Sequence, residues 1–157
     1  MSEAPLQPEH RSLAQLYSYW LEKKGEQVAP PRGAIRPDEI VELLPDIAMV
    51  DVVGDPPRFR ARLVGTRIVS AFGRDSTGKF LDEIDYAEIK PEVFERLRAA
   101  VAQRRPNIHR SRLTTAGGRH LRYESIIMPL SSDGAAIDML LIGVAVDIAY
   151  QDRLPRA

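Results

Sequence analysis

The glycines and the lysine of residues 73–80, GRDSTGKF, are the first candidates for a chemical role. They nearly match G-x-x-x-x-G-K-[ST], the loop whose backbone N–H groups cradle the phosphates of a nucleotide. Phe80, however, stands where this loop needs the hydroxyl group that binds Mg²⁺. The loop should also follow a strand, whereas the residues before Gly73 have the spacing of a helical turn. We therefore interpret residues 73–80 as a structural turn.

Three histidines, His10, His109 and His120, are the next candidates for acid–base or ligand chemistry. They are not grouped with Asp and Glu at the spacing of a metal site, so no metal site is predicted. His109 could serve as a general base, assisted by Tyr123 or Glu124. Alternation along a strand, however, would put Glu124 on the opposite face from Tyr123. An enzyme that uses His109 is therefore the alternative function, and no catalytic residue is assigned.

Arginines accumulate between residues 96 and 122, where eight of them occur without any acidic residue. The favoured interpretation is a solvated face on which the arginine stems cover apolar sheet. The alternative is a site for an anion or an acidic partner, because guanidinium groups bind carboxylate and phosphate with two hydrogen bonds. Nucleic acid is not predicted, because exposed aromatic residues for base stacking are missing from this region.

The composition describes an ordinary globular chain of 157 residues, long enough for one domain with its own core. Lys plus Arg and Asp plus Glu are equal at 22 each, so no net charge favours nucleic acid or an anionic membrane. The absence of cysteine excludes disulfides and thiol nucleophiles. The N-terminus lacks the features of a signal peptide, and the apolar run 139–146 is too short to cross a bilayer. The predicted location is cytoplasmic.

A helix is predicted from about Pro8 to Lys24, because one of its faces carries apolar residues at three–four spacing. Residues 25–37 then combine proline and glycine in a way that is typical of an extended connector. The apolar face could pack on its own domain or on a second subunit, and the connector favours the second. We therefore predict a homodimer or partner face formed by Leu13, Leu16, Tyr17, Trp20 and Leu21.

The remaining elements are two strands, a helical middle and three strands. A short helix at 37–44 precedes strands at 47–53 and 58–64, which the Gly-Asp-Pro-Pro turn joins as a hairpin. Helical turns follow at 66–72 and near residue 75, and a long helix is predicted at 91–104. Strands at about 108–115, 119–128 and 138–146 complete the chain. This order predicts an α+β fold with one five-stranded antiparallel sheet and helices on one face, plus the N-terminal helix.

This order of elements resembles that of a PAS domain, and the last strand, LIGVAVDI, is similar to the end of that fold. Several local motifs extend the resemblance: Tyr19-Trp20, Pro31-Arg32, Leu44-Pro45, Gly65-Thr66, Gly73-Arg74-Asp75 with Thr77-Gly78, and Met128-Pro129-Leu130-Ser131. They are similar to those of a bacterial subgroup of stand-alone, single PAS-domain proteins of uncharacterised function. The chain is therefore expected to consist of an N-terminal helix and connector at 1–36, a PAS-like domain at 37–148 and a short tail at 149–157.

The resemblance also bears on cofactors. The haem ligand of a PAS-like domain is expected from the long helix, and residues 91–104 hold no histidine, so haem is not predicted. A flavin that forms a cysteine adduct is excluded because the chain has no cysteine. No cofactor is predicted, and a noncovalent small ligand is the alternative that stays open.

The register at the Ala116-Gly117-Gly118 turn decides which side chains enter a cavity. A three-residue loop pairs Ser111 with Tyr123 and turns His109, Ser111, Tyr123 and Ser125 inward. A two-residue loop would turn Arg110 and Arg112 inward, and we prefer the first register because the second buries two charges. Such a wall suits a small, weakly polar ligand, and a filled core is the alternative. The phenylalanines expected to line or fill this space are Phe59, Phe72, Phe80 and Phe94.

The predicted function is a non-enzymatic sensory or protein-interaction module of bacterial signalling. Residues 148–157 are too few for a signalling helix and an effector domain. The module is therefore expected to act in trans on a separate protein partner, without nucleic acid or membrane.

Overall fold

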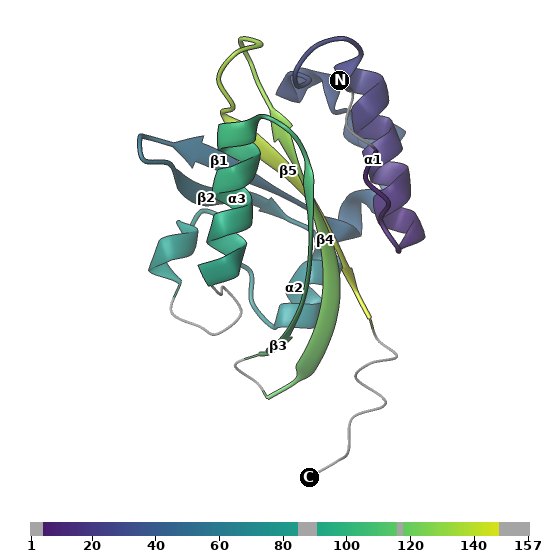
Figure 1. Ribbon diagram of the computed structural model, residues 1–157. Helices are drawn as coiled ribbons and strands as arrows, with labels where there is room; N and C mark the ends of the chain where they lie inside the picture. Colours follow the sequence, from purple (N-terminus) through teal and green to yellow (C-terminus); the bar gives the residue numbers. More distant parts are fainter. Residues whose placement is uncertain (1–4, 85–90, 116–117, 148–157) are drawn as a thin grey trace.

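The structure is a computed structural model that describes residues 5–84, 91–115 and 118–147. The predicted tail at 149–157 and the glycine-rich tip of the turn at 116–117 lie outside the described residues. Five antiparallel strands form one sheet in the order β2-β1-β5-β4-β3 (Figure 1). This arrangement confirms the predicted fold class. The strands are β1 (Ile47–Val53), β2 (Arg58–Val64), β3 (Asn107–Thr114), β4 (His120–Leu130) and β5 (Met139–Val146).

Helices lie on both faces of this sheet. One face is covered by α2 (Thr66–Phe72), by a 3₁₀ turn at Leu81–Glu83 and by α3 (Pro91–Gln103). The other face carries α1 (Arg11–Lys24), which lies against β4 and β5. Between α1 and β1 the chain forms three 3₁₀ turns, at Arg32–Ala34, Pro37–Glu39 and Val41–Asp46, where a single short helix had been expected.

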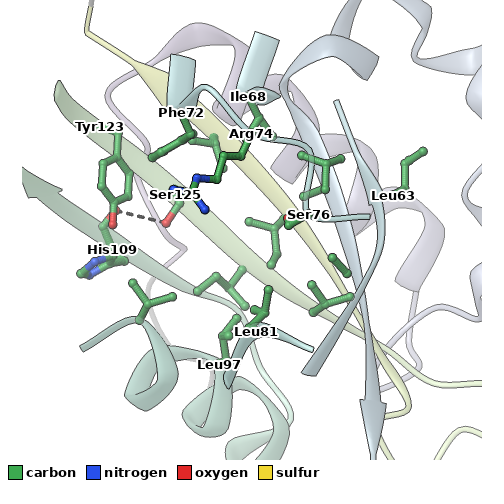
Figure 2. Close-up of a pocket in the computed structure, with 18 residues that line it drawn as sticks. Leu63, Ile68, Phe72, Arg74, Ser76, Leu81, Leu97, His109, Tyr123 and Ser125 are labelled. Atoms are coloured by element: carbon green, nitrogen blue, oxygen red, sulfur yellow. Dashed lines mark hydrogen bonds between the residues drawn. The ribbon is translucent and has the colours of Figure 1, made fainter. Parts of the chain in front are cut away.

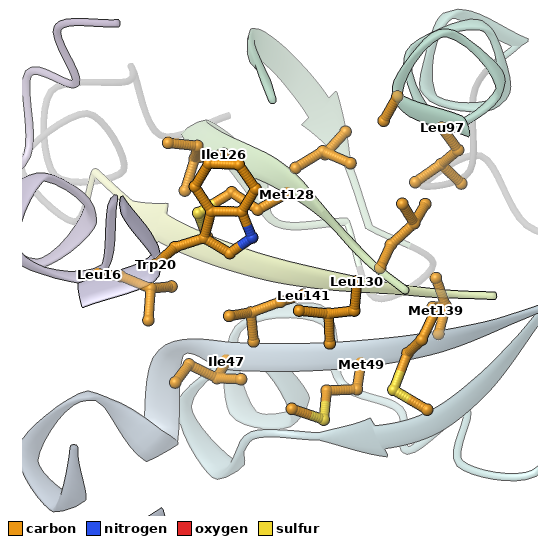
Figure 3. Close-up of a cluster of buried hydrophobic side chains, with 14 of the residues drawn as sticks. Leu16, Trp20, Ile47, Met49, Leu97, Ile126, Met128, Leu130, Met139 and Leu141 are labelled. Carbon is orange, nitrogen blue, oxygen red and sulfur yellow. The ribbon is translucent and has the colours of Figure 1, made fainter. Parts of the chain in front are cut away.

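The apolar face of α1 packs on its own sheet. Leu13, Leu16 and Trp20 are each 1% exposed, and the Trp20 indole N–H donates a hydrogen bond to the Pro129 carbonyl at 2.9 Å. Figure 3 shows Trp20 and Leu16 over the buried side chains of the sheet. The prediction that these three residues form a dimer or partner face was wrong. Of that predicted set only Leu21 is exposed, while Tyr17 is half-buried and its ring stacks on Trp20.

Gly143 on β5 explains why α1 can approach so closely. A Cβ atom at this position would lie 2.8 Å from a methyl carbon of Leu13 and 2.8 Å from one of Leu16. The connector also follows the sheet, because Ala29 is fully buried and the Pro30 carbonyl accepts a hydrogen bond from the Ser131 N–H at 3.0 Å. The prediction of an extended connector that separates α1 from the core was therefore wrong.

A buried carboxylate from β4 anchors the start of α1. The residue before the helix, His10, does not cap it with its side chain. Instead the Glu124 carboxylate accepts hydrogen bonds from the backbone N–H groups of Glu9 at 2.9 Å and His10 at 3.0 Å. The His10 Nδ1 and the Arg110 Nε lie 2.8 Å and 2.9 Å from the same carboxylate. Glu124 thus supplies the negative charge that a helix N-terminus favours.

The turn that leads into α2 is held by a second close approach. A Cβ atom at Gly65 would lie 2.4 Å from the Pro45 carbonyl oxygen and 2.6 Å from the Leu44 carbonyl oxygen. Two of the motifs noted in the sequence, Leu44-Pro45 and Gly65-Thr66, are therefore one packing contact. Gly73, at φ +79°, ends α2 in the left-handed conformation that favours glycine.

Residues 74–80 return along the edge of β2 as a turn. The Gly78 N–H donates to the Ala61 carbonyl at 2.6 Å, and the Ala61 N–H donates to the Lys79 carbonyl at 2.9 Å. The Asp75 carboxylate accepts the Thr77 N–H at 3.0 Å. The backbone N–H groups of Thr77, Gly78 and Lys79 are thus bonded within the fold, in agreement with the structural interpretation of GRDSTGKF.

Candidate functional site

A cavity of about 150 Å³ lies between the sheet and the helices α2 and α3. Figure 2 shows Ile68 and Phe72 of α2 on one side of it and Leu97 of α3 on the other, with strand residues between them. Two lining residues, Leu63 and Arg74, are exposed, so the cavity reaches the surface beside them. Most of its wall is apolar and includes Ala48, Val50, Ala61, Leu81, Val93, Ile127, Ile142 and Val144.

The strand register that decides the polar part of this wall is the preferred one. Ser111 pairs with Tyr123 and His109 pairs with Ser125, and the Thr115 N–H donates to the Arg119 carbonyl at 2.8 Å. The loop therefore spans residues 116–118. This register turns Arg110 away from the cavity and towards Glu124, which avoids the burial of an unpaired charge.

The structure brings half of the predicted cavity residues together. Phe72, His109, Tyr123 and Ser125 line the cavity. The ring of Tyr123 packs edge to face with two of its neighbours. Its centroid lies 6.1 Å from that of Phe72, with 74° between the ring planes, and 5.7 Å from that of His109, with 66° between the planes. The Ser125 hydroxyl donates to the His109 carbonyl at 3.4 Å.

The other four predicted residues do not line the cavity as the structure describes it. Phe59 is buried in the main core, and Phe94 packs against that core at its margin. Phe80 lies beneath the guanidinium group of Arg58, which is 4.0 Å from the ring centroid. Ser111 turns to α3, where its hydroxyl donates to the Glu92 carboxylate at 2.7 Å.

Two polar lining residues were not predicted, Arg74 and Ser76. Both belong to the turn after α2, which was interpreted as structural. Their position follows from the return of this turn along β2, where Gly78 and Lys79 bond to Ala61. Alternation along a strand cannot reveal such residues, because a loop has no fixed period.

Tyr123 keeps its proton at neutral pH. Burial, together with the nearby negative charge of Glu92, raises the pKa of Tyr123 to about 12, although a hydrogen bond with Ser111 acts in the opposite direction. The phenol is therefore a hydrogen-bond donor at the cavity wall. Glu92 also lies near the imidazole, with 3.8 Å between its carboxylate and the His109 Nε2.

The arrangement assembles only part of the alternative active site, because it brings Tyr123 but not Glu124 to His109. Glu124 was considered as an assistant to His109, but it lies on the α1 face of the sheet, where it holds Glu9, His10 and Arg110. His109 is 5% exposed and packs against Tyr123. Of the two assistants considered for His109, Tyr123 therefore lies beside the imidazole and Glu124 lies on the opposite face of the sheet.

Residues 8–145 match the family of the PAS domain. The chain belongs to the PAS domain family. PAS domains are a family of sensory and interaction modules that are generally non-enzymatic. The resemblance noted in the sequence is thereby confirmed at the level of the family. None of the helices in the described ranges is long and apolar enough to cross a membrane.

Solved structures with the same fold include several light-oxygen-voltage domains. One, from a study of a flavin analogue and the domain's mechanism, has a TM-score of 0.53 at 12% identity and covers 73% of this chain and 89% of its own. The light-state structure of the blue-light photoreceptor Aureochrome1 LOV has a TM-score of 0.53 at 11% identity, with coverage of 73% and 91%. The Rhodobacter sphaeroides LOV protein has a TM-score of 0.52 at 13% identity, with coverage of 71% and 68%. These identities show the shared fold alone, and no curated protein matches this chain.

The cavity of this PAS domain does not fit a flavin. A dry apolar cavity of about 150 Å³ holds one benzene molecule, whereas the isoalloxazine of a flavin has three fused rings. The present cavity has about that volume, and the chain has no cysteine that could form an adduct. Haem is larger still, and α3 carries no histidine.

Proposed function

We propose that this PAS domain is a non-enzymatic sensor that binds a small, weakly polar molecule in the cavity between the sheet and the helices α2 and α3. The observation that supports the proposal is the cavity itself, with its apolar wall and the polar groups of His109, Tyr123 and Ser125. Ligand sites in proteins combine a largely apolar lining with a few placed polar groups in this way.

A bound ligand would contact the helices that form the wall of the cavity. Phe72 and Ile68 belong to α2 and Leu97 to α3, so a ligand that fills the cavity contacts both helices directly. Because close-packed elements shift as units when a void between them is filled, α2 and α3 are the elements that would report the ligand.

We further propose that the domain acts in trans on a protein partner in the cytoplasm of a bacterium, as a member of the stand-alone PAS subgroup that its motifs resemble. The buried face of α1 cannot serve this contact, so the partner is expected elsewhere. Among the residues that the structure describes, the large apolar side chains that remain exposed are Leu21, Val28, Val41 and Leu63.

The test is native and denaturing mass spectrometry of the protein purified from its own cells. We expect a small molecule that is retained in the native spectrum and lost on denaturation. Ala48 lines the cavity, so Ala48→Leu should fill part of the space and abolish retention. Ala102→Leu, on the exposed side of α3, is the matched control and should retain the molecule. Equal retention by the two variants would contradict the proposed site.

A further inference from the structure

Polar groups in the wall of the cavity are already bonded to other groups of the protein. The Ser125 hydroxyl donates to the His109 carbonyl at 3.4 Å, and Tyr123 shares a hydrogen bond with the Ser111 side chain. Arg74, which also lines the cavity, is engaged in an interaction of its own. We infer that the ligand is a small, uncharged, hydrocarbon-like molecule that binds without a hydrogen bond from the protein. This inference rests on the proposed function, because it names the class of ligand for the same cavity.

Two further polar side chains line the cavity, those of His109 and Ser76. The His109 imidazole packs against the Tyr123 ring, and its Nε2 lies 3.8 Å from the Glu92 carboxylate. Ser76 is only half-buried and belongs to the same turn as the exposed Arg74, so water can reach its hydroxyl. A ligand inside the cavity therefore meets a wall that offers it apolar contacts rather than hydrogen bonds.

Such a wall selects against polar groups on the ligand. A hydroxyl or an amide that leaves water without a compensating hydrogen bond loses its hydration, and a charged group loses far more. An apolar molecule instead gains by leaving water. It also competes with no tightly held water, because a water molecule is held in a cavity only by about two to four polar partners.

The size of the cavity limits the ligand to about one ring. About 150 Å³ is the space that one benzene molecule fills in an apolar protein cavity, and the present cavity has this volume. Phe72 and Ile68 bound it on the side of α2 and Leu97 on the side of α3 (Figure 2). A ligand of this size would contact carbon atoms on both sides, and the summed dispersion attraction of such contacts is large.

The probes are toluene, phenol and benzoate, which share a ring and differ in one substituent. Toluene and phenol have nearly the same shape, so they differ mainly in whether a hydroxyl must be buried. Binding is measured by isothermal titration calorimetry at neutral pH, where benzoate is ionised and phenol is not. We expect toluene to bind at least about tenfold more tightly than phenol, since the phenol hydroxyl finds no partner in the wall. Benzoate should show no measurable binding.

A hydroxyl placed in the wall should change this preference. Val144 is half-buried on β5 and lines the cavity, and Val144→Thr replaces one of its methyl groups with a hydroxyl. The preference for toluene over phenol should fall at least about threefold, because the new hydroxyl offers phenol a partner. Val53→Thr is the matched control, because Val53 is a half-buried strand residue that does not line the cavity. Val64→Thr, also in the wall, replaces Val144→Thr if that variant does not fold.

The outcomes separate this inference from the proposed function. If phenol binds as tightly as toluene, or if benzoate binds, the inference is overturned and the cavity remains a binding site. If Val144→Thr and Val53→Thr show the same preference, toluene does not bind in this cavity and the inference is again overturned. If none of the probes binds, the molecule retained in the native mass spectrum decides. A hydrocarbon-like molecule supports the inference, a polar or charged one overturns the inference alone, and the absence of any ligand overturns both.

Discussion

Removal of the charge on Glu124 should detach α1 from the sheet. The side chain is 1% exposed and accepts hydrogen bonds from the backbone N–H groups of Glu9 and His10 and from Arg110. Glu124→Gln keeps the shape of the side chain but replaces one acceptor oxygen with an NH₂ group. That group would face donors, so at least one buried N–H loses its partner.

The loss of stability expected for Glu124→Gln can be estimated from these contacts. A hydrogen bond to a charged group contributes about 1.5–3 kcal/mol, and breaking one partner of a buried ion pair costs about 3–5 kcal/mol. The Arg110 side chain is 47% exposed, so water recovers part of its loss. We therefore expect Glu124→Gln to lower the free energy of unfolding by about 2–4 kcal/mol.

Urea denaturation is the assay, with the fluorescence of Trp20 as the reporter. Trp20 is the single tryptophan of the chain and is buried in the contact between α1 and the sheet. Glu83→Gln is the matched control, because Glu83 also accepts from an arginine, at 2.8 Å, but its side chain is 62% exposed. The free energy of unfolding of Glu83→Gln should differ from that of the wild type by no more than the error of the measurement. A loss for Glu124→Gln no larger than that of Glu83→Gln would refute the anchoring role.

The stabilisation that the Glu124 carboxylate provides should also depend on pH, in a direction that its pKa determines. Burial of the Glu124 carboxyl acts to raise its pKa, but hydrogen bonds from Glu9, His10 and Arg110 outweigh burial and hold the pKa below its usual value. A lowered pKa means that the ionised group stabilises the fold above the unfolded-state pKa of about 4.3. This contribution is lost as the pH falls through the lowered value. The difference between wild type and Glu124→Gln should therefore be full at neutral pH and shrink in acid.

Three further predictions test the close packing at two glycines and the raised pKa of Tyr123. Gly143→Ala should lower the free energy of unfolding by about 1–3 kcal/mol and shift Trp20 fluorescence to the red, because the new Cβ displaces α1. Gly65→Ala should lower the melting temperature far more than Gly33→Ala, since its Cβ meets backbone oxygen while that of Gly33 meets nothing within 4 Å. In an alkaline absorbance titration, one tyrosine should ionise only near pH 12, and Tyr123→Phe should remove that step. Because its folded pKa is raised, Tyr123 stabilises the fold below pH 10 and loses this contribution as the pH rises towards 12.

The sheet and the long helix could be read from the sequence because local rules fix them. The strands predicted at 47–53 and 58–64 and the helical turn at 66–72 have the observed bounds. The pairing of Ser111 with Tyr123 was predictable too, because the other register buries two arginines. These are decisions that neighbouring residues determine.

The position of α1 could not be read in this way, because its contacts join residues that are far apart in the sequence. Glu124 lies 114 residues from His10, and Trp20 lies 109 residues from Pro129. The proline-rich connector suggested separation, although it packs along the sheet. One signal was present, since Gly143 interrupts an apolar strand, and a glycine there often marks the close approach of another element.

The site was predictable only where it is built on strands. His109, Tyr123 and Ser125 follow from the alternation of β3 and β4, while Arg74 and Ser76 depend on the path of a turn. The phenylalanines were less informative, because an aromatic residue fills a core, covers an edge or lines a cavity equally well by its type. Phe80 lies under Arg58 because the turn brings it to the edge of β2.

Strand β4 links the two faces of the domain. Tyr123 and Ser125 line the cavity, while Glu124, which lies between them in the strand, holds the start of α1 on the other face. Because neighbouring residues of a strand share the same peptide units, a movement of the β4 backbone at Tyr123 also moves the Glu124 carboxylate. That carboxylate meets backbone donors at about their ideal length, so its anchoring contacts are sensitive to small shifts. The anchor of α1 therefore lies one residue away from the cavity wall, on the opposite side of the same strand.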